Sequence, residues 1–147
     1  MTSSDAPIDP LCEDFYLRLL QLRLANAAHT ELIQGEHLTV LHYLPGEQYR
    51  PHRDYLPPSA LAERRPQAGQ RLRTACVYLN VPSAGGETDF PQLGVRLTPK
   101  LGSAVIFDNL GDNGEPEPAS LHAGLPVLAG EKWLATLWIR LAPFRSF

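Results

Sequence analysis

The sequence predicts a mainly β fold of sandwich, barrel or jelly-roll type, with one helix before the strands. Short runs rich in β-branched and aromatic residues follow one another along the chain, separated by turn residues. The 147 residues include 11 Gly and 14 Pro, which punctuate these runs at the spacing typical of such folds. This length suits one domain with a sizeable core, so we expect no second domain.

A helix is predicted from Asp9 to about Asn26. Asp9 can cap its first turn, where Pro10 is favoured because the missing N–H has no helical partner there. The apolar residues that follow recur at helical spacing: Leu11, Phe15, Leu19 and Leu22. We expect this helix to pack on the β structure.

The predicted strands cover residues 36–44, 71–81, 94–100, 103–109 and 132–141. Two segments interrupt the strand rhythm, residues 56–70 and 110–119, and we interpret them as long loops. Such loops are either lids of a site or plain solvent-exposed connections. Gly85 and Gly86 suit a tight turn that needs positive φ.

Charge and cysteine content exclude several classes of function. Thirteen Lys and Arg against 16 Asp and Glu give a net charge of -3, so the chain has no overall electrostatic attraction to nucleic acid or an anionic membrane. No apolar run approaches membrane-spanning length, and the first ten residues lack the basic and apolar regions of a targeting signal. Cys12 and Cys76 are too few for a disulfide scaffold or a thiolate zinc site, so we expect a cytoplasmic protein.

The stretch "YRPHRDYLPP", residues 49–58, places His52 and Asp54 two residues apart. In a strand both side chains point to one face, while Arg53 points away. An imidazole nitrogen and a carboxylate oxygen that meet there supply two-thirds of the two-histidine, one-carboxylate triad that holds non-haem Fe(II). The alternative to a metal ligand is a surface histidine that is hydrogen-bonded to its neighbour.

The third ligand of such a triad must be another histidine. His122, in "SLHAGLPV", is the natural candidate, because it lies next to strand-like sequence 68 residues beyond Asp54. We expect no ligand role for the remaining histidines, which are His29, His37 and His42.

A lysine occupies an apolar strand face in "KWLATLWI". Lys132 shares that face with Leu134, Thr136 and Trp138. Unpaired burial of an ammonium is costly, whereas the carboxylate of a ligand would satisfy it. The alternative is a lysine that reaches solvent from the end of its strand.

Four segments resemble, in order, successive motifs of the 2-oxoglutarate- and Fe(II)-dependent prolyl 4-hydroxylases: "LHYLPGEQYRPHRDYL", "RTACVYLNVPSAGGETDFP", "LTPKLGSAVIFDN" and "SLHAGLPVLAGEKWLATLWI". The resemblance covers residues 38–139, and the N-terminal helix resembles the segment that precedes these motifs in the family. Four ordered motifs with matching spacing are far more specific than any one of them.

The resemblance implies a double-stranded β-helix, the jelly roll of cupin-like proteins. It implies that Fe(II) is held by His52, Asp54 and His122, and that 2-oxoglutarate chelates the iron with its oxo acid end. Lys132 would then pair with the distal carboxylate of 2-oxoglutarate. Three further positions match those that line the cosubstrate pocket in the family: Tyr43, Tyr78 and Thr88.

The resemblance also suggests substrate contacts. Trp138 matches a position near the substrate. Four arginines flank a loop that lies near the peptide groove in the family, and of these we expect Arg73 to contact the substrate: Arg64, Arg65, Arg71 and Arg73. A positive rim of this kind could favour an acidic peptide, and the alternative is a solvated basic loop.

The implied activity is hydroxylation of prolyl residues in a peptide or protein, with decarboxylation of 2-oxoglutarate to succinate, O2 as the oxidant and ascorbate as a supporting reductant. The presence of Asp54 favours hydroxylation, since halogenating relatives lack that carboxylate. A free amino acid or small metabolite is the alternative substrate. A non-catalytic jelly-roll binding module is the alternative of another class, and retention of all three ligands and Lys132 argues against it. We expect residues 1–147 to form one dioxygenase domain, either alone or as the C-terminal catalytic part of a longer protein.

Overall fold

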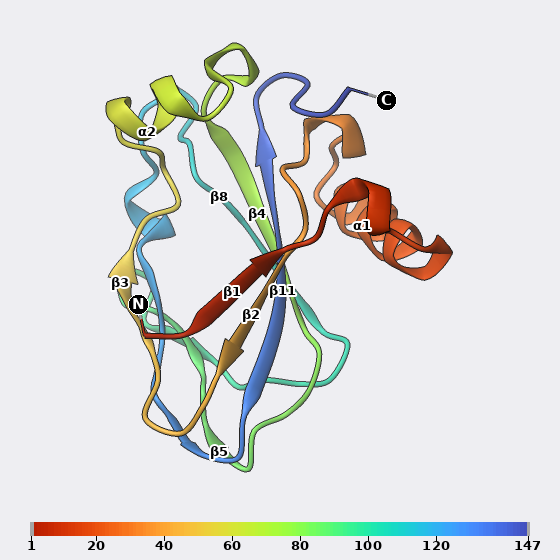
Figure 1. Cartoon of the computed structure of the whole chain (residues 1–147). Coiled ribbons are helices and arrows are strands. Elements are labelled where there is room, and N and C mark those ends of the chain that lie inside the picture. The colour runs from red at the N-terminus through yellow and green to blue at the C-terminus, as the bar shows by residue number, and fades with distance from the viewer. Residues whose placement is uncertain (1, 147) are drawn as a thin grey trace.

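Two antiparallel sheets face each other across an internal pocket. A computed structural model describes residues 2–146. The larger sheet runs through the middle of Figure 1, and its strand order is β1-β2-β11-β4-β8. The smaller sheet has the order β3-β9-β6-β7, and β10 pairs with β5 at one end of the molecule. Two facing antiparallel sheets with few helices are the arrangement that the predicted jelly roll requires.

The strand bounds are as follows: β1 Ser4–Pro7, β2 Thr39–Tyr43, β3 Tyr49–His52, β4 Arg71–Tyr78, β5 Ala84–Gly85, β6 Thr88–Phe90, β7 Val95–Leu97, β8 Ala104–Asp108, β9 His122–Gly124, β10 Val127–Ala129 and β11 Lys132–Arg140. Each predicted strand contains an observed one. Four of these, β2, β4, β8 and β11, have five or more residues, enough for a clear period of two, whereas β7 has three. The strands that were not predicted have two to four residues, too few for that period to register. Gly85 and Gly86 have the positive φ that the turn prediction required.

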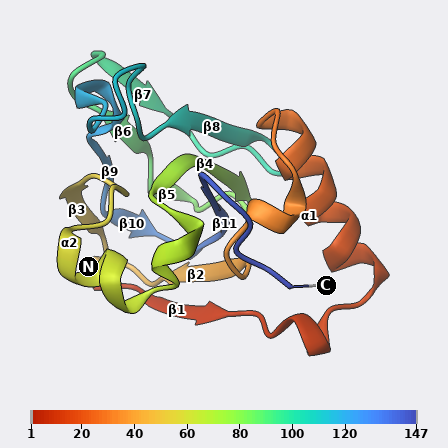
Figure 2. The ribbon, with the colours of Figure 1, turned by 90° about the horizontal axis from the view of Figure 1, so that it is seen from above.

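The two faces of the larger sheet serve different purposes. One face is covered by α1 (Phe15–Ala27), which lies on the side away from the smaller sheet in Figure 2. Its core consists of small and branched residues of the sheet and the helix, including Leu24, Ala25, Ala75, Ala135 and Leu137. The other face looks toward the smaller sheet and contributes Leu41, Tyr43, Tyr78 and Leu134 to a second cluster.

The helix prediction is correct in existence and wrong in start and orientation. Asp9 caps only the short 3-10 turn Pro10–Cys12, and α1 begins at Phe15, where Asp14 accepts a hydrogen bond from the Leu17 N–H. The four residues that defined the predicted apolar side are exposed: Leu11 by 94%, Phe15 by 73%, Leu19 by 39% and Leu22 by 48%. The helix is apolar on more than one side, so spacing alone could not select the face that Leu24 and Ala25 occupy.

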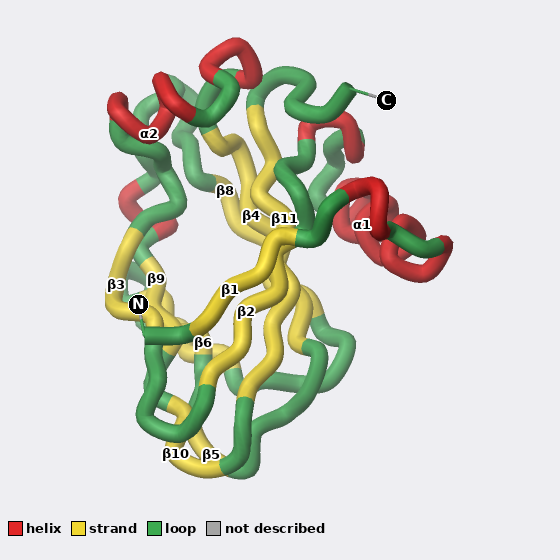
Figure 3. Tube along the Cα trace, viewed as in Figure 1, coloured by secondary structure: helices red, strands yellow, loops and turns green. Residues whose placement is uncertain are grey.

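The two predicted loops contain short helical turns, seen in Figure 3. Residues 56–70 hold α2 (Pro58–Glu63) and the 3-10 turn Pro66–Ala68, and residues 110–119 run into a second such turn, Pro118–Ser120. A further 3-10 turn, Leu32–Gln34, follows α1. Among residues 2–146, no helix combines the length and the hydropathy that crossing a membrane requires.

Candidate metal centre and adjoining pocket

Three predicted ligand residues converge at one end of the space between the sheets. His52 is the last residue of β3, Asp54 follows two residues later, and His122 opens β9. Pairing of β3 with β9 sets His52 directly opposite His122. The Asp54 Oδ1 atom lies 3.4 Å from His52 Nε2 and 3.9 Å from His122 Nε2. The three side chains can therefore offer ligand atoms that all lie within 4.8 Å of one another.

Backbone carbonyls fix which nitrogen each imidazole presents. His52 Nδ1 lies 2.8 Å from the Arg50 carbonyl oxygen, and His122 Nδ1 lies 2.8 Å from that of Ser120. A carbonyl oxygen only accepts, so each Nδ1 carries the proton and each Nε2 has its lone pair free. Burial lowers the pKa of His122, which favours the neutral, ligating form.

The carboxylate of Asp54 is ionised. Burial opposes ionisation, but the hydrogen bond from Thr74 and the charge of Arg71, together with His52 and His122 when these imidazoles are protonated in the metal-free site, outweigh it and hold the pKa of Asp54 below its usual value. Two imidazole lone pairs and one carboxylate oxygen thus face a common point. This donor set fits a divalent transition metal such as Fe(II) and leaves coordination positions for other ligands.

A buried lysine lies in the same pocket. Lys132 is 1% exposed, and its ammonium stands over the rings of Tyr43 and Tyr78, 5.1 and 5.7 Å from their centroids. Burial lowers its pKa to about 8. No carboxylate within residues 2–146 forms an ion pair with it. Its environment therefore suits an anionic ligand, as the strand pattern predicted.

One pocket is lined both by Lys132 and by the three ligand residues. Its wall includes Tyr43 and Thr88, two of the three positions predicted to line it, and the predicted Trp138. Tyr78 and Thr88 are joined by a 2.6 Å hydrogen bond between their hydroxyl groups. The structure thus brings seven of the nine predicted site residues into the wall of one pocket: His52, Asp54, His122, Lys132, Tyr43, Thr88 and Trp138. Tyr78 lies behind this wall, where it contacts Thr88 and the ammonium of Lys132. Their individual roles remain predictions.

Arg73 is the predicted site residue that the structure leaves outside. Its guanidinium bonds Asp108 Oδ1 at 2.5 Å and the Ala28 carbonyl at 2.7 Å, so it lies on the α1 side of the sheet. The register of β4 against β11 shifts between Arg71 and Arg73, a β-bulge that turns Arg71 to the other face. Arg71, not Arg73, therefore borders the site, with its guanidinium 4.2 Å from the centroid of the Trp138 ring.

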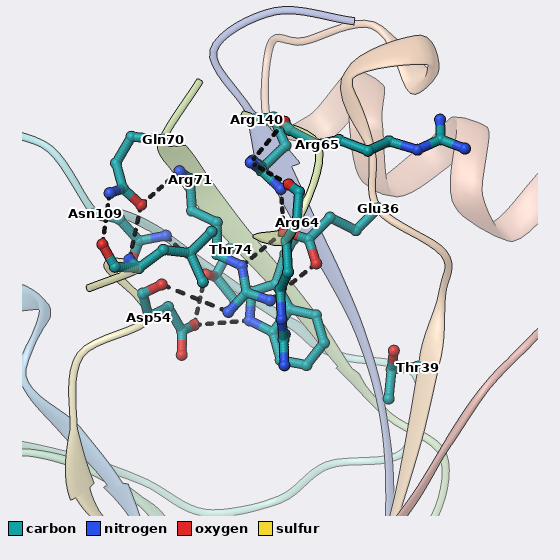
Figure 4. Close-up of polar contacts among 12 residues, drawn as sticks. Glu36, Thr39, Asp54, Arg64, Arg65, Gln70, Arg71, Thr74, Asn109 and Arg140 are labelled. Carbon is teal, nitrogen blue, oxygen red and sulfur yellow. Dashed lines mark hydrogen bonds and ion pairs between the residues drawn. The ribbon is translucent and has the colours of Figure 1, made fainter. Parts of the chain in front are cut away.

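Sequence reasoning missed several neighbours of the site. Tyr49 stacks on His52 at 3.7 Å between ring centroids. Glu36 receives two 2.8 Å hydrogen bonds from Arg71 and one of 3.2 Å from Arg140, as Figure 4 shows. Thr74 lies on the more polar face of its strand, which alternation assigns to the pocket side, whereas nothing in the local pattern marks Glu36.

A groove adjoins the pocket. It shares Leu41, Tyr49 and Trp138 with the pocket and continues beyond them. The rest of its wall comes from β1, the start of β2, the loop after α2 and the C-terminal segment: Asp5, Pro7, Glu36, His37, Thr39, Arg64, Arg71 and Phe144. Trp138 therefore lies between the pocket and the groove and belongs to the walls of both.

Comparison with known proteins agrees with this geometry. Residues 38–140 match the 2OG-Fe(II) oxygenase superfamily. A protein of Acanthamoeba polyphaga mimivirus is 42% identical over 113 residues, which are 75% of this chain and 47% of that protein. Prolyl 4-hydroxylase 1 of Arabidopsis thaliana is 35% identical over 137 residues, covering 84% of this chain and 47% of the relative. The chain thus spans about half the length of these curated relatives.

Among solved structures, the viral collagen prolyl hydroxylase of Paramecium bursaria Chlorella virus-1, in its complex with 2OG, superimposes with a TM-score of 0.78 at 31% identity. The match covers 94% of this chain and 79% of the viral one. The chain therefore belongs to the 2OG-Fe(II) oxygenase superfamily, and within it to the prolyl 4-hydroxylase family. The predicted family is confirmed.

Proposed function

We propose that this chain is an Fe(II)- and 2-oxoglutarate-dependent hydroxylase of prolyl residues in a peptide or protein, and that its 147 residues form one catalytic domain. The observation that carries the proposal is one pocket with two kinds of anchor. Two imidazoles and a carboxylate converge at one point, and the ammonium of Lys132, which has no ion-pair partner among residues 2–146, lies elsewhere in the wall. A dicarboxylic oxo acid has matching groups at its two ends.

When bound, iron with 2-oxoglutarate and O2 supplies the oxidising chemistry, in which decarboxylation to succinate accompanies hydroxylation of the substrate. The chain's own residues bind the metal and 2-oxoglutarate and orient them. His52, Asp54 and His122 would hold the metal, and Lys132 would pair with the distal carboxylate of 2-oxoglutarate. Apolar neighbours such as Leu134 line the pocket, and a less polar surrounding strengthens that ion pair.

A peptide is favoured over a free amino acid because the groove continues past the pocket. A substrate proline could lie against Trp138 and Tyr49 while its neighbours extend toward Arg64 and Phe144. The relatives support the prolyl assignment through their names: prolyl 4-hydroxylase for the plant protein and collagen prolyl hydroxylase for the viral one. We also propose a reducing location such as the cytoplasm, since Cys12 and Cys76 are both free thiols.

The test is turnover. The protein is incubated with Fe(II), 2-oxoglutarate, ascorbate, air and proline-rich peptides, with free proline in parallel. We expect succinate and a peptide mass increase of one oxygen atom in equal amounts, and neither product from His122→Ala. Hydroxylation of free proline with no reaction of peptides would show that the substrate is a free amino acid and not a peptide. Absence of succinate with every substrate would overturn the proposal.

A further inference from the structure

The two oxygens of the Asp54 carboxylate have different surroundings. Oδ1 faces His52 and His122, whereas Oδ2 accepts a 2.7 Å hydrogen bond from the Thr74 hydroxyl and a 3.1 Å hydrogen bond from Trp138 Nε1. Asp54 is 6% exposed and Thr74 is fully buried, so water does not compete for these bonds. One oxygen is thus occupied by protein donors and the other faces the point where the histidines meet.

The hydrogen bonds behind Thr74 have a fixed direction. An ionised carboxylate only accepts, so the single Thr74 proton goes to Asp54 and its oxygen must accept from elsewhere. Asn109 supplies that donor, with its Nδ2 2.9 Å from the Thr74 hydroxyl oxygen. Asn109 is fully buried at the end of β8 and donates its own backbone N–H to the Leu72 carbonyl. The chain from Asn109 to Thr74 to Asp54 is therefore aligned, and each bond polarises the next.

Trp138 is also held in place. The Arg71 guanidinium covers its ring and is itself fixed by two hydrogen bonds to Glu36, visible in Figure 4. Glu36 is braced in turn by Arg140, which is fully buried. The indole N–H therefore points at Asp54 from a ring that cannot rotate freely, and the wall of the groove is connected to a candidate metal ligand.

We infer that Thr74, Trp138 and Asn109 are positioning residues that commit one oxygen of Asp54 to the protein, so that the carboxylate presents a single oxygen to the metal. This inference rests on the proposed function. A carboxylate that offered both oxygens would fill an additional coordination position. Loss of an outer hydrogen bond that orients a metal ligand commonly lowers metal affinity by about 10- to 100-fold.

Metal affinity, measured without turnover, tests the inference. Mn(II) is titrated into the metal-free protein and free Mn(II) is followed by electron paramagnetic resonance. Thr74→Val removes one donor at nearly constant volume, and Trp138→Phe removes the other while keeping a ring beneath Arg71. Thr74→Ser restores the hydroxyl. Trp133→Phe is the matched control, since Trp133 stacks on His42 on the opposite face of β11.

We expect Thr74→Val and Trp138→Phe each to weaken Mn(II) binding about tenfold or more, and Thr74→Ser and Trp133→Phe to stay within about twofold of wild type. Melting temperatures of the metal-free variants identify any loss of Mn(II) affinity that is caused by unfolding. If Thr74→Val folds poorly, the single variants Trp138→Phe and Thr74→Ser still decide the test. Wild-type affinity in Trp138→Phe and Thr74→Val, with binding lost in His122→Ala, would overturn the positioning role alone. Equal binding by wild type and His122→Ala would overturn the metal site and this inference together.

Discussion

Lys132→Met should stabilise the ligand-free protein while it damages the binding of 2-oxoglutarate. The ammonium of Lys132 is buried without a carboxylate partner among residues 2–146. Methionine has a similar length and no charge, so it fills the same space without the desolvation cost. The two effects have opposite signs, which separates a functional lysine from a structural one.

The magnitude follows from the pKa of Lys132. Its decrease from 10.5 to about 8 means that burial of the charged ammonium lowers the free energy of unfolding of the ligand-free protein by about 3 kcal/mol at pH 7. Contacts of the ammonium with the Tyr43 and Tyr78 rings return about 1 kcal/mol. We therefore expect the free energy of unfolding of Lys132→Met to exceed that of wild type by about 2 kcal/mol at pH 7.

The sign of the pH dependence is fixed. Between pH 8 and 10.5 the unfolded chain holds the Lys132 proton and the folded protein releases it, so the cost to wild type disappears as pH rises through this window. Tyrosine and cysteine titrations occur in both proteins and cancel in the difference. Urea unfolding at several pH values measures it.

The same substitution should weaken 2-oxoglutarate binding to the Mn(II) protein by at least about 100-fold, because the distal carboxylate loses its buried partner. Calorimetric titration of 2-oxoglutarate measures this affinity. A ligand-free Lys132→Met protein that is less stable than wild type at pH 7 would refute the reasoning, since Lys132 would then be satisfied by the fold itself.

Three further predictions concern the pocket, the groove and the helix. The affinity of wild type for 2-oxoglutarate should fall by up to about tenfold per pH unit above the Lys132 pKa of about 8, and calorimetry from neutral to alkaline pH should find a flat profile in Lys132→Met. Arg73→Ala should leave the KM for peptide unchanged in turnover assays, whereas Arg71→Ala should raise it and also destabilise the fold by about 3 kcal/mol, because Glu36 loses a buried partner; equal effects of the two would contradict the assignment of faces. Leu24→Ala should cost about 2–5 kcal/mol in chemical unfolding and Leu22→Ala less than about 0.5 kcal/mol, and the reverse order would mean that α1 packs through its predicted side.

The strands and the ligand residues could be predicted because their signals are local. Alternation over five or more residues identified β2, β4, β8 and β11, and the i, i+2 spacing of His52 and Asp54 put both on one side of the chain. The pairing of β3 with β9, which brings His122 opposite His52, was not predicted. The sequence offered His122 as the third ligand only because it is a histidine beside strand-like sequence, and the resemblance to a family supported that choice. Strands of three or four residues carry too little pattern to predict their partners.

The errors have equally specific causes. Arg71 and Arg73 have the same strand parity, so alternation could not show that a bulge turns Arg71 toward the site and leaves Arg73 bound to Asp108. The orientation of α1 was unpredictable because the face that is buried depends on the sheet beneath it, where Leu24 joins one core cluster with Ala75 and Leu137. The bulge in β4 and the buried face of α1 both depend on contacts between elements, so the sequence of one element alone does not predict them.

The central claim is that His52, Asp54 and His122 hold Fe(II) to which 2-oxoglutarate binds, and an anaerobic titration tests it most directly. Fe(II) and then 2-oxoglutarate are added to the protein in the absence of O2, and visible absorption is followed for the charge-transfer band of an iron-chelated oxo acid. We predict a band that saturates in wild type and is absent in folded His122→Ala. A folded wild-type protein without the band, or a band of equal strength in both proteins, would contradict the account.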